Sequence, residues 1–172
     1  MQKITDVDPH LRASFVDAMS KVVTSVSVVT TAGSAGQFGA TVSAVVSVSA
    51  DPPLVSVCVN RSSPLVSAIR QNQVFCVNVL TTEQAEVSDT FAGKPKMGRA
   101  FDFACATWRK ATTESPVLEG ALAVFDCRVA SELDAGTHTI FVGNVIRTEH
   151  AEADALIHSR RQYGRATLIV QP

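Results

Sequence analysis

The sequence predicts a mainly β fold, in which a barrel of strands carries a few short helices. Short runs of β-branched and apolar residues recur along the chain and are separated by turn residues, whereas helical periodicity is confined to three segments. With 46% hydrophobic and 18% charged residues, the chain can bury a core, which excludes a disordered protein. A length of 172 residues favours one domain, 1–172.

The first third of the chain changes from helical to strand periodicity. Apolar residues recur at spacings of three and four before the β-branched runs begin. In order, this part predicts a helix over 9–22, strands over 26–31, 40–49 and 54–59, and a glycine-containing turn over 32–36. Within 40–49 the hydroxyls of Thr41, Ser43 and Ser47 share one parity and the apolar residues share the other. Asp51-Pro52-Pro53 ends that strand, because consecutive prolines cannot donate to a ladder.

Helix-start signals mark two further segments. Ser63 suits an N-cap and Pro64 the first helical position, which predicts a helix to about residue 71. Thr81 and Gln84 have the spacing of a capping box at the start of a short helix that ends near residue 92. The remaining pattern predicts strands over 74–80, 107–110, 121–133, 139–148 and 166–170, and a loop over 94–99.

Charge and hydropathy exclude several classes of protein. The formal net charge of −1 argues against a dedicated nucleic-acid binder. The N-terminus lacks the apolar stretch of a signal peptide, and glycines, prolines and Asp51 interrupt the best candidate for a membrane span. We therefore expect a soluble cytoplasmic protein without a membrane partner.

The cysteines and histidines indicate no metal site. Cys58, Cys76, Cys105 and Cys127 form no C-x-x-C pair, and the four histidines form no H-E-x-x-H motif. Three of the cysteines lie among apolar residues, so we expect buried reduced thiols, with a disulfide as the alternative.

Two neighbouring segments have the residue types that a flavin mononucleotide needs. Small residues and hydroxyls over 39–49 would let a flat ring lie against the backbone, whose amides and carbonyls could contact the ring edge. Asn60-Arg61-Ser62-Ser63-Pro64 places hydroxyls, an arginine and the amides of a helix start together, which suits a phosphate. The alternative interpretation is an exposed strand face followed by an ordinary N-cap.

Five segments, in order, resemble the flavin reductase-like family. The first is G-x-T-V-S-A-x-x-S-V-S-x-D-P-P-L-V over 39–55. The others are F-x-V-N-V-L over 75–80, P-x-L-x-G-A-L-A over 116–123, G-x-H-x-x-x-x-G over 136–143 and Tyr163-Gly164. The resemblance spans about 15–170 and implies a split β-barrel of Greek-key-like type that binds a flavin.

The resemblance also implies roles for individual residues. It assigns the isoalloxazine and ribityl groups to Thr41, Val42, Ser43, Ala44, Ser47 and Ser49, and the flavin phosphate to Asn60, Ser62 and Ser63. Phe91 and Lys94 resemble positions near the phosphate or adenylate part; the alternative for Lys94 is a solvated loop charge. His138 is implied to line the nicotinamide side, although Thr137 stands where the family's usual Asp would be. Tyr163 is placed near the nucleotide, with a core or dimer contact as the alternative.

The function implied is that of an NAD(P)H:flavin oxidoreductase. It would transfer hydride to FAD or FMN and supply reduced flavin to a separate monooxygenase acting on an aromatic compound. No basic cluster suits a 2′-phosphate, which favours NADH over NADPH. The resemblance further implies a homodimer. Two alternatives remain: a flavin- or haem-binding split barrel without turnover, and a cofactor-free interaction domain.

Overall fold

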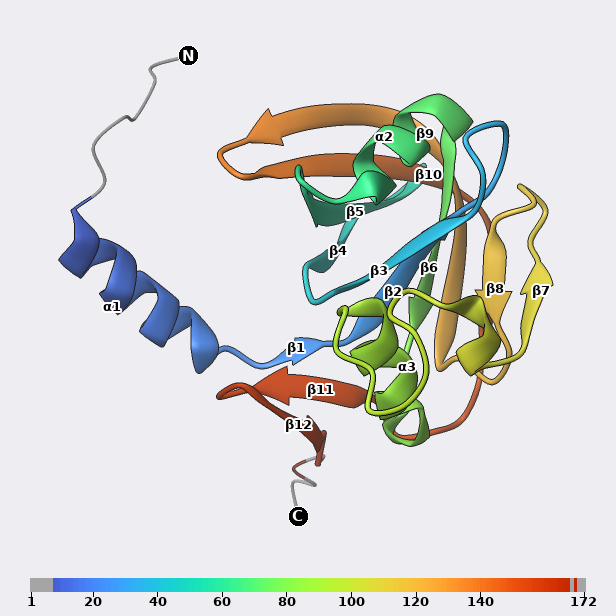
Figure 1. Ribbon diagram of the computed structural model, residues 1–172. Coiled ribbons are helices and arrows are strands. Elements are labelled where there is room, and N and C mark those ends of the chain that lie inside the picture. The colour runs from blue at the N-terminus through green and yellow to red at the C-terminus, as the bar shows by residue number, and fades with distance from the viewer. Residues whose placement is uncertain (1–7, 168, 170–172) are drawn as a thin grey trace.

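The largest sheet has seven strands, all paired antiparallel, in the order β3-β2-β6-β9-β10-β5-β4. The computed structural model describes residues 8–167 and 169 (Figure 1). The seven strands are β2 (Ser27–Thr31), β3 (Phe38–Val42), β4 (Val45–Ala50), β5 (Pro53–Asn60), β6 (Val74–Val79), β9 (Ala123–Ala135) and β10 (His138–His150).

Smaller elements surround this sheet. One small sheet contains β1 (Thr24–Ser25), β11 (Leu156–Ser159) and β12 (Gln162–Arg165), and the other contains β7 (Trp108–Lys110) and β8 (Pro116–Leu118). The helices are α1 (Pro9–Ser20), α2 (Pro64–Asn72) and α3 (Ala85–Phe91), with short 3-10 turns at Thr82–Gln84 and Phe103–Cys105. The mainly β fold with flanking helices is confirmed.

The main sheet curls but does not close. Its two edges are β3 and β4, which follow each other in sequence and are joined by Ser43 and Ala44 alone. The chain therefore crosses from one edge to the other in two residues. The crossing leaves an open seam between β3 and the β4–β5 side of the sheet, which is the feature of a split barrel.

Two apolar clusters lie on opposite sides of the curled sheet. The cluster inside the curl includes Val57, Phe75 and Phe141, all fully buried, and α2 packs against it through Leu65 and Ile69. The second cluster lies under α3, β8 and β11. On β2 and β6 its residues alternate with those of the first cluster, because successive side chains of a strand point to opposite faces of the sheet. Because both faces of β2 and β6 are covered, all five residues of β2 and the four central residues of β6 are buried.

The predicted elements agree with the structure except at three places. The strand predicted over 40–49 breaks at Ser43 and Ala44, and a register shift follows between Ser47 and Ser49, so its parity is not continuous. The pattern missed β1, β8, β11 and β12, which have only two to four residues each. The strand predicted over 166–170 lies partly outside the described residues, and the described residues 166, 167 and 169 are not in a strand.

Asn78 joins two of the segments that carry the family resemblance. Its side chain is fully buried, and Nδ2 donates to the Val28 carbonyl at 3.1 Å. Its Oδ1 accepts the backbone N–H of Leu118 at 2.8 Å. The asparagine of the F-x-V-N-V-L segment therefore holds β8 against the sheet, a structural role.

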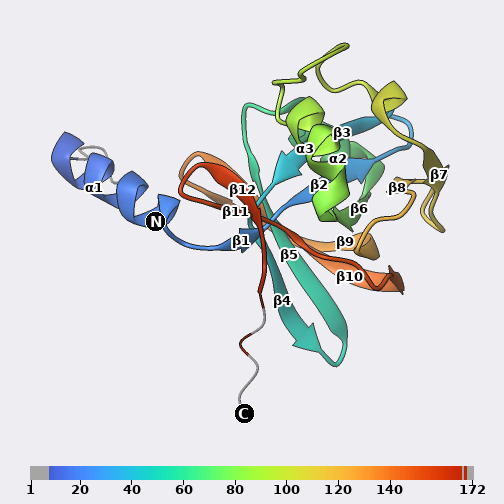
Figure 2. The same cartoon turned by 90° about the horizontal axis from the view of Figure 1, so that it is seen from below.

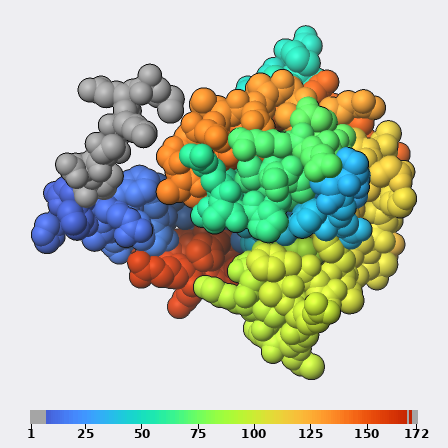
Figure 3. All heavy atoms as spheres, turned by 45° about the horizontal axis from the view of Figure 1, so that its top comes forward, coloured from blue at the N-terminus to red at the C-terminus, as the bar shows by residue number. Residues whose placement is uncertain are grey.

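The first helix stands away from the barrel. Asp8 caps α1 by accepting the N–H of His10, yet none of the helix residues is buried. Figure 2 shows α1 projecting beside the sheet, and Figure 3 shows it at one side of the molecule. Its apolar residues, among them Leu11, Phe15 and Met19, are exposed. In the described part of the chain, no helix is both long and apolar enough to cross a bilayer.

Gly143 on β10 offers a test of the barrel interior. A Cβ there would lie 2.4 Å from Cζ of Phe75 and 2.8 Å from Cβ of Cys127, and both neighbours are fully buried. We expect Gly143→Ala to lower the free energy of unfolding by about 1–3 kcal/mol, because a packed core cannot absorb the methyl group. Urea denaturation followed by circular dichroism measures the change. Gly164→Ala is the control, because its Cβ would meet Ile157 at an ordinary 3.5 Å; equal stability of the two variants would contradict the packing.

Candidate functional site

A pocket of about 240 Å³ opens in the seam of the sheet. Its walls come from three places: the end of β3 and the crossing residues, the end of β5 with the start of α2, and the start of β10. The lining residues are Ala40, Thr41, Val42, Ser43, Ala44, Cys58, Val59, Asn60, Ser63 and His138. The structure therefore brings together seven of the residues expected from sequence, which come from segments up to 97 positions apart (138 − 41).

The crossing gives this pocket a wall of small residues. Ser43 and Ala44 belong to neither strand, and the Ala44 carbonyl accepts the N–H of Cys58 at 3.1 Å. The proton of the Thr41 hydroxyl is not available to a ligand, because it is donated to the Ser88 carbonyl at 2.7 Å, a contact that fixes β3 against α3. The wall beside a ligand is therefore made of small side chains and main-chain polar groups.

The loop before α2 forms the second wall, and here the expectation of free amides is wrong. The N–H groups of Ser62 and Ser63 donate to the side chain and the carbonyl of Asn60, at 2.9 Å each. The N–H of Leu65 donates to the Ser63 hydroxyl oxygen at 3.3 Å. The groups left for an anion are the Ser63 hydroxyl proton, the Asn60 amide Nδ2, and the positive end of α2.

His138 stands at the mouth of the pocket as the first residue of β10. In the pairing of β10 with β5, His138 lies opposite Asn60. Its ring Nδ1 is 2.9 Å from the Thr137 hydroxyl, and the residue is exposed. The imidazole and the loop before α2 therefore lie on the same side of the seam.

A second hollow of about 190 Å³ shares Thr41, Val42 and Ser43 with the seam pocket. On its far side is Tyr163, whose hydroxyl is 2.8 Å from both Ser88 Oγ and Asp89 Oδ1. Partial burial raises the pKa of Tyr163, so the phenol keeps its proton at neutral pH. Tyr163 thus lies beside the crossing, separated from His138 by the segment 41–43.

Other residues expected at the site do not line the seam pocket. Ser47 and Ser49 lie along β4, which runs away from the pocket; Ser47 pairs with Val55 and Ser49 with Leu54. The hydroxyl of Ser49 accepts the N–H of Asp51 at 3.2 Å. The hydroxyl of Ser62 is also engaged, since it donates to Asn60 Oδ1 at 2.8 Å.

Phe91 lies in the core and not at a ligand surface. It is 1% exposed, and its ring contacts Phe103 and Trp108 edge to face, with centroids 4.9 and 5.5 Å apart. A Cβ on Gly39 would lie 2.7 Å from the Phe91 ring. Gly39, the first residue of the 39–55 segment, therefore leaves room for the ring of Phe91. The position expected for Phe91 near the nucleotide is wrong, because its ring is packed in the core.

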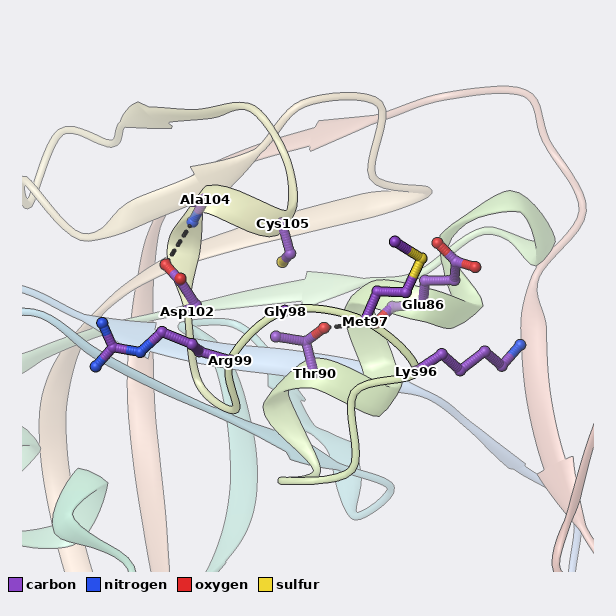
Figure 4. Close-up of a pocket in the computed structure, with 9 residues that line it drawn as sticks. All are labelled: Glu86, Thr90, Lys96, Met97, Gly98, Arg99, Asp102, Ala104 and Cys105. Atoms are coloured by element: carbon purple, nitrogen blue, oxygen red, sulfur yellow. Dashed lines mark hydrogen bonds between the residues drawn. The ribbon is translucent and has the colours of Figure 1, made fainter.

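A cavity on the other side of α3 is not part of the seam. It measures about 440 Å³ and lies between α3 and the loop 94–102 (Figure 4). Thr90 and Cys105 point toward its middle, whereas the charged ends of Lys96 and Arg99 point outward. Lys94 is exposed on the same loop and lies outside the lining of both this cavity and the seam pocket.

Cys58 lines the seam pocket, although no sequence pattern predicted it there. Along β5 the odd-numbered residues from Val55 to Val59 are buried, which leaves Cys58 on the same face as Asn60. Partial burial raises the pKa of the Cys58 thiol. The alternation of the strand was the signal that could have identified it. All four cysteines are free; Cys76 and Cys127 are buried as expected, whereas Cys58, also expected to be buried, is only partly so.

The residues of the seam fit a flavin. A flat polar ring needs a wall without bulky side chains, and the small residues Ser43 and Ala44, which lie between two strands, supply it. A phosphate needs donors at a helix start, and Asn60 and Ser63 supply them. Among the described residues, no group of three metal-binding side chains competes with this interpretation.

Comparisons with known proteins give the same family. The model of the flavin reductase like domain matches residues 19–167. The FMN reductase (NADH) RutF of Acinetobacter baylyi is 42% identical over 152 residues, which are 87% of this chain and 79% of that protein.

Solved structures agree with this match. The flavin reductase PheA2 superposes with a TM-score of 0.83 at 31% identity, covering 94% of this chain and 100% of that one. The NADH:FAD oxidoreductase SgcE6 of Streptomyces globisporus, in complex with NAD and FAD fragments, gives 0.82 at 28% identity, covering 94% and 96%. The styrene monooxygenase flavin reductase of Pseudomonas putida gives 0.79 at 27% identity, covering 91% and 99%.

Proposed function

The chain belongs to the flavin reductase-like family and is an NADH-dependent flavin reductase, and from this premise we propose that the seam pocket is where FMN or FAD is reduced. The observation that supports this location is the meeting of three walls there: small residues at the crossing, donors at the start of α2, and His138. When bound, the flavin accepts a hydride from NADH and a proton from water, which yields reduced flavin and NAD⁺.

The chain's contribution to the reaction is placement. Ser43 and Ala44 would lie against the ring edge, and Asn60 and Ser63 would hold the phosphate, because all four residues line the pocket. His138 hydrogen-bonds the nicotinamide carboxamide from the open side. Hydride transfer needs no protein base, so holding the two rings together supplies the rate enhancement, which reaches about 7–11 kcal/mol in favourable systems. Tyr163 closes the far side of the crossing, and Lys94 contacts the outer part of the nucleotide.

We propose further that the reduced flavin leaves for a separate monooxygenase that acts on an aromatic compound. The name of the styrene monooxygenase flavin reductase describes such a division of labour, with an aromatic substrate for the oxygenase. The open mouth of the pocket at His138 would let the reduced flavin depart. The proposal places the enzyme in the cytoplasm, where free thiols such as those of Cys76 and Cys127 persist.

The exposed apolar surfaces support a homodimer. A helix of 12 residues with no buried side chain is only marginally stable alone in water. The edge strand β4 exposes Val46 and Val48, at 59% and 51%, and an uncovered apolar edge invites pairing. Because no element among residues 8–167 covers the apolar side chains of α1 or of β4, we propose a second copy as the partner on these surfaces.

Turnover tests the enzymatic proposal directly. Purified protein, NADH and excess FMN or FAD are mixed anaerobically, and absorbance at the nicotinamide band is followed. We expect flavin-dependent oxidation of NADH, and a lower kcat/KM with NADPH because no basic cluster lies at the pocket to bind a 2′-phosphate. Stoichiometric flavin binding without oxidation of either dinucleotide would favour the alternative, a flavin-carrying split barrel.

Cys58 reports on where the flavin binds. Its thiol lines the seam pocket, so bound FMN should slow its alkylation by N-ethylmaleimide several-fold at pH 8. Burial raises the pKa of both Cys58 and Cys105, but Cys105 lies in the cavity beyond α3 and serves as the internal control. Peptide mass spectrometry measures both rates. Equal protection of the two thiols, or of neither, would place the flavin elsewhere.

The dimer can be broken by charge on α1. We expect Phe15→Glu combined with Leu11→Glu to give a monomer in sedimentation velocity, because both side chains are more than 60% exposed in the single chain. Met97→Glu is the control, since Met97 is 88% exposed on the loop 94–102, away from α1. A double variant that sediments like the unmodified protein would show that α1 is not the interface.

A further inference from the structure

Arg61 fastens the loop before α2 to the turn between β9 and β10. Its backbone N–H donates to the Thr137 carbonyl at 3.0 Å. Its side-chain Nη1 donates to the Gly136 carbonyl at 3.3 Å. Arg61, which the sequence places beside a candidate phosphate site, therefore directs its backbone N–H and one side-chain donor at the turn that precedes His138.

Asp134, on the other side of the turn, interacts with Arg61 and with α2 and so also holds the turn in place. Its Oδ2 lies 3.8 Å from Arg61 Nε, and its Oδ1 accepts from Arg70 Nη2 at 2.9 Å and from the Thr139 hydroxyl at 2.6 Å. The Thr139 hydrogen bond, followed by the two arginine charges, lowers the pKa of Asp134. The carboxylate is therefore ionised at neutral pH and available to both arginines.

Thr137 connects this fastened turn to the imidazole. Its carbonyl accepts from Arg61, while its hydroxyl is 2.9 Å from His138 Nδ1. An imidazole ring on an exposed strand end can rotate about its Cβ–Cγ bond and present either nitrogen. A hydroxyl held beside Nδ1 selects the orientation in which Nε2 is turned away from Thr137, and in the tautomer in which this hydroxyl donates to Nδ1 the ring proton is on Nε2.

We propose that Thr137 is a positioning residue for nicotinamide binding: anchored by Arg61, its hydroxyl orients His138 so that Nε2–H faces the dinucleotide. The inference rests on the proposed function, in which His138 contacts the nicotinamide carboxamide. In this chain a neutral hydroxyl stands where the family resemblance leads one to expect a carboxylate. It orients the ring without adding a negative charge beside it.

Removing the hydroxyl tests the proposal. We expect Thr137→Val, which keeps the shape of the side chain, to raise KM for NADH roughly three- to tenfold, the effect of losing one hydrogen bond. The kcat and the dissociation constant of FMN should change less than twofold. Thr137→Ser should restore the original KM, because it restores the hydroxyl. A general disturbance of the turn would instead lower kcat and persist in Thr137→Ser, and that result would overturn the proposal.

A double-mutant cycle separates this inference from the proposed function. In a His138→Ala background, Thr137→Val should have no further effect on KM, because its hydroxyl acts through the imidazole. If His138→Ala alone leaves KM for NADH unchanged, the proposed contact of His138 is wrong. If His138→Ala raises KM but Thr137→Val does not, the proposed contact stands and the positioning role is wrong.

The anchor is tested with an acceptor that has no phosphate. We expect Arg61→Gln to raise KM for NADH with riboflavin as well as with FMN, because the arginine acts on the turn. Arg147→Gln is the control: Arg147 lies near the other end of β10 and pairs with Glu149 at 3.1 Å. An Arg61→Gln variant impaired with FMN but normal with riboflavin would make Arg61 a phosphate contact and overturn its role as anchor.

Discussion

The seam that the main sheet leaves open is the constraint on which the site depends. Had β3 paired with β4 or β5 along its length, the backbone groups at the crossing would be used in the ladder. Instead Ser43 and Ala44 span the gap between two sheet edges, and small side chains there leave space. The pocket therefore exists because the sheet does not close. Its walls are formed by the crossing and by the ends of the strands and the helix that meet there.

Glycines maintain that arrangement by allowing aromatic rings to approach the strands. At Gly143 the ring of Phe75 fills the place of a side chain inside the curl, and at Gly39 the ring of Phe91 does so on the other face. The two glycines belong to segments that resemble flavin-binding signatures, yet both contacts are internal. Such signatures thus combine residues that shape the barrel with residues that face the ligand, and only the structure separates them.

Local signals in the sequence were sufficient for most elements and for half of the site. Alternation predicted the long strands, and Ser63 with Pro64 predicted the start of α2, because these signals depend on neighbouring residues alone. The break at Ser43 and Ala44 could not be predicted, since both residues continue the alternation of hydroxyl and apolar side chains. The position of Ser47 depends on the same break, and the position of Phe91 depends on its packing against distant aromatic residues. No local sequence pattern contains either kind of information.

The distribution of charge around the pocket follows from the same topology. Because β10 pairs with β5 from its first residue, the β9–β10 turn reaches the loop before α2, and Arg61 meets Asp134 there. Arg70 on α2 meets Asp134 and Glu132 at 2.9 Å each, so the two positive charges nearest the seam are balanced by two carboxylates. The pocket itself is lined by neutral groups, with His138 its one titratable residue besides Cys58. In a pocket with so few charges, the directions of hydrogen-bond donors and acceptors decide which ligand can bind.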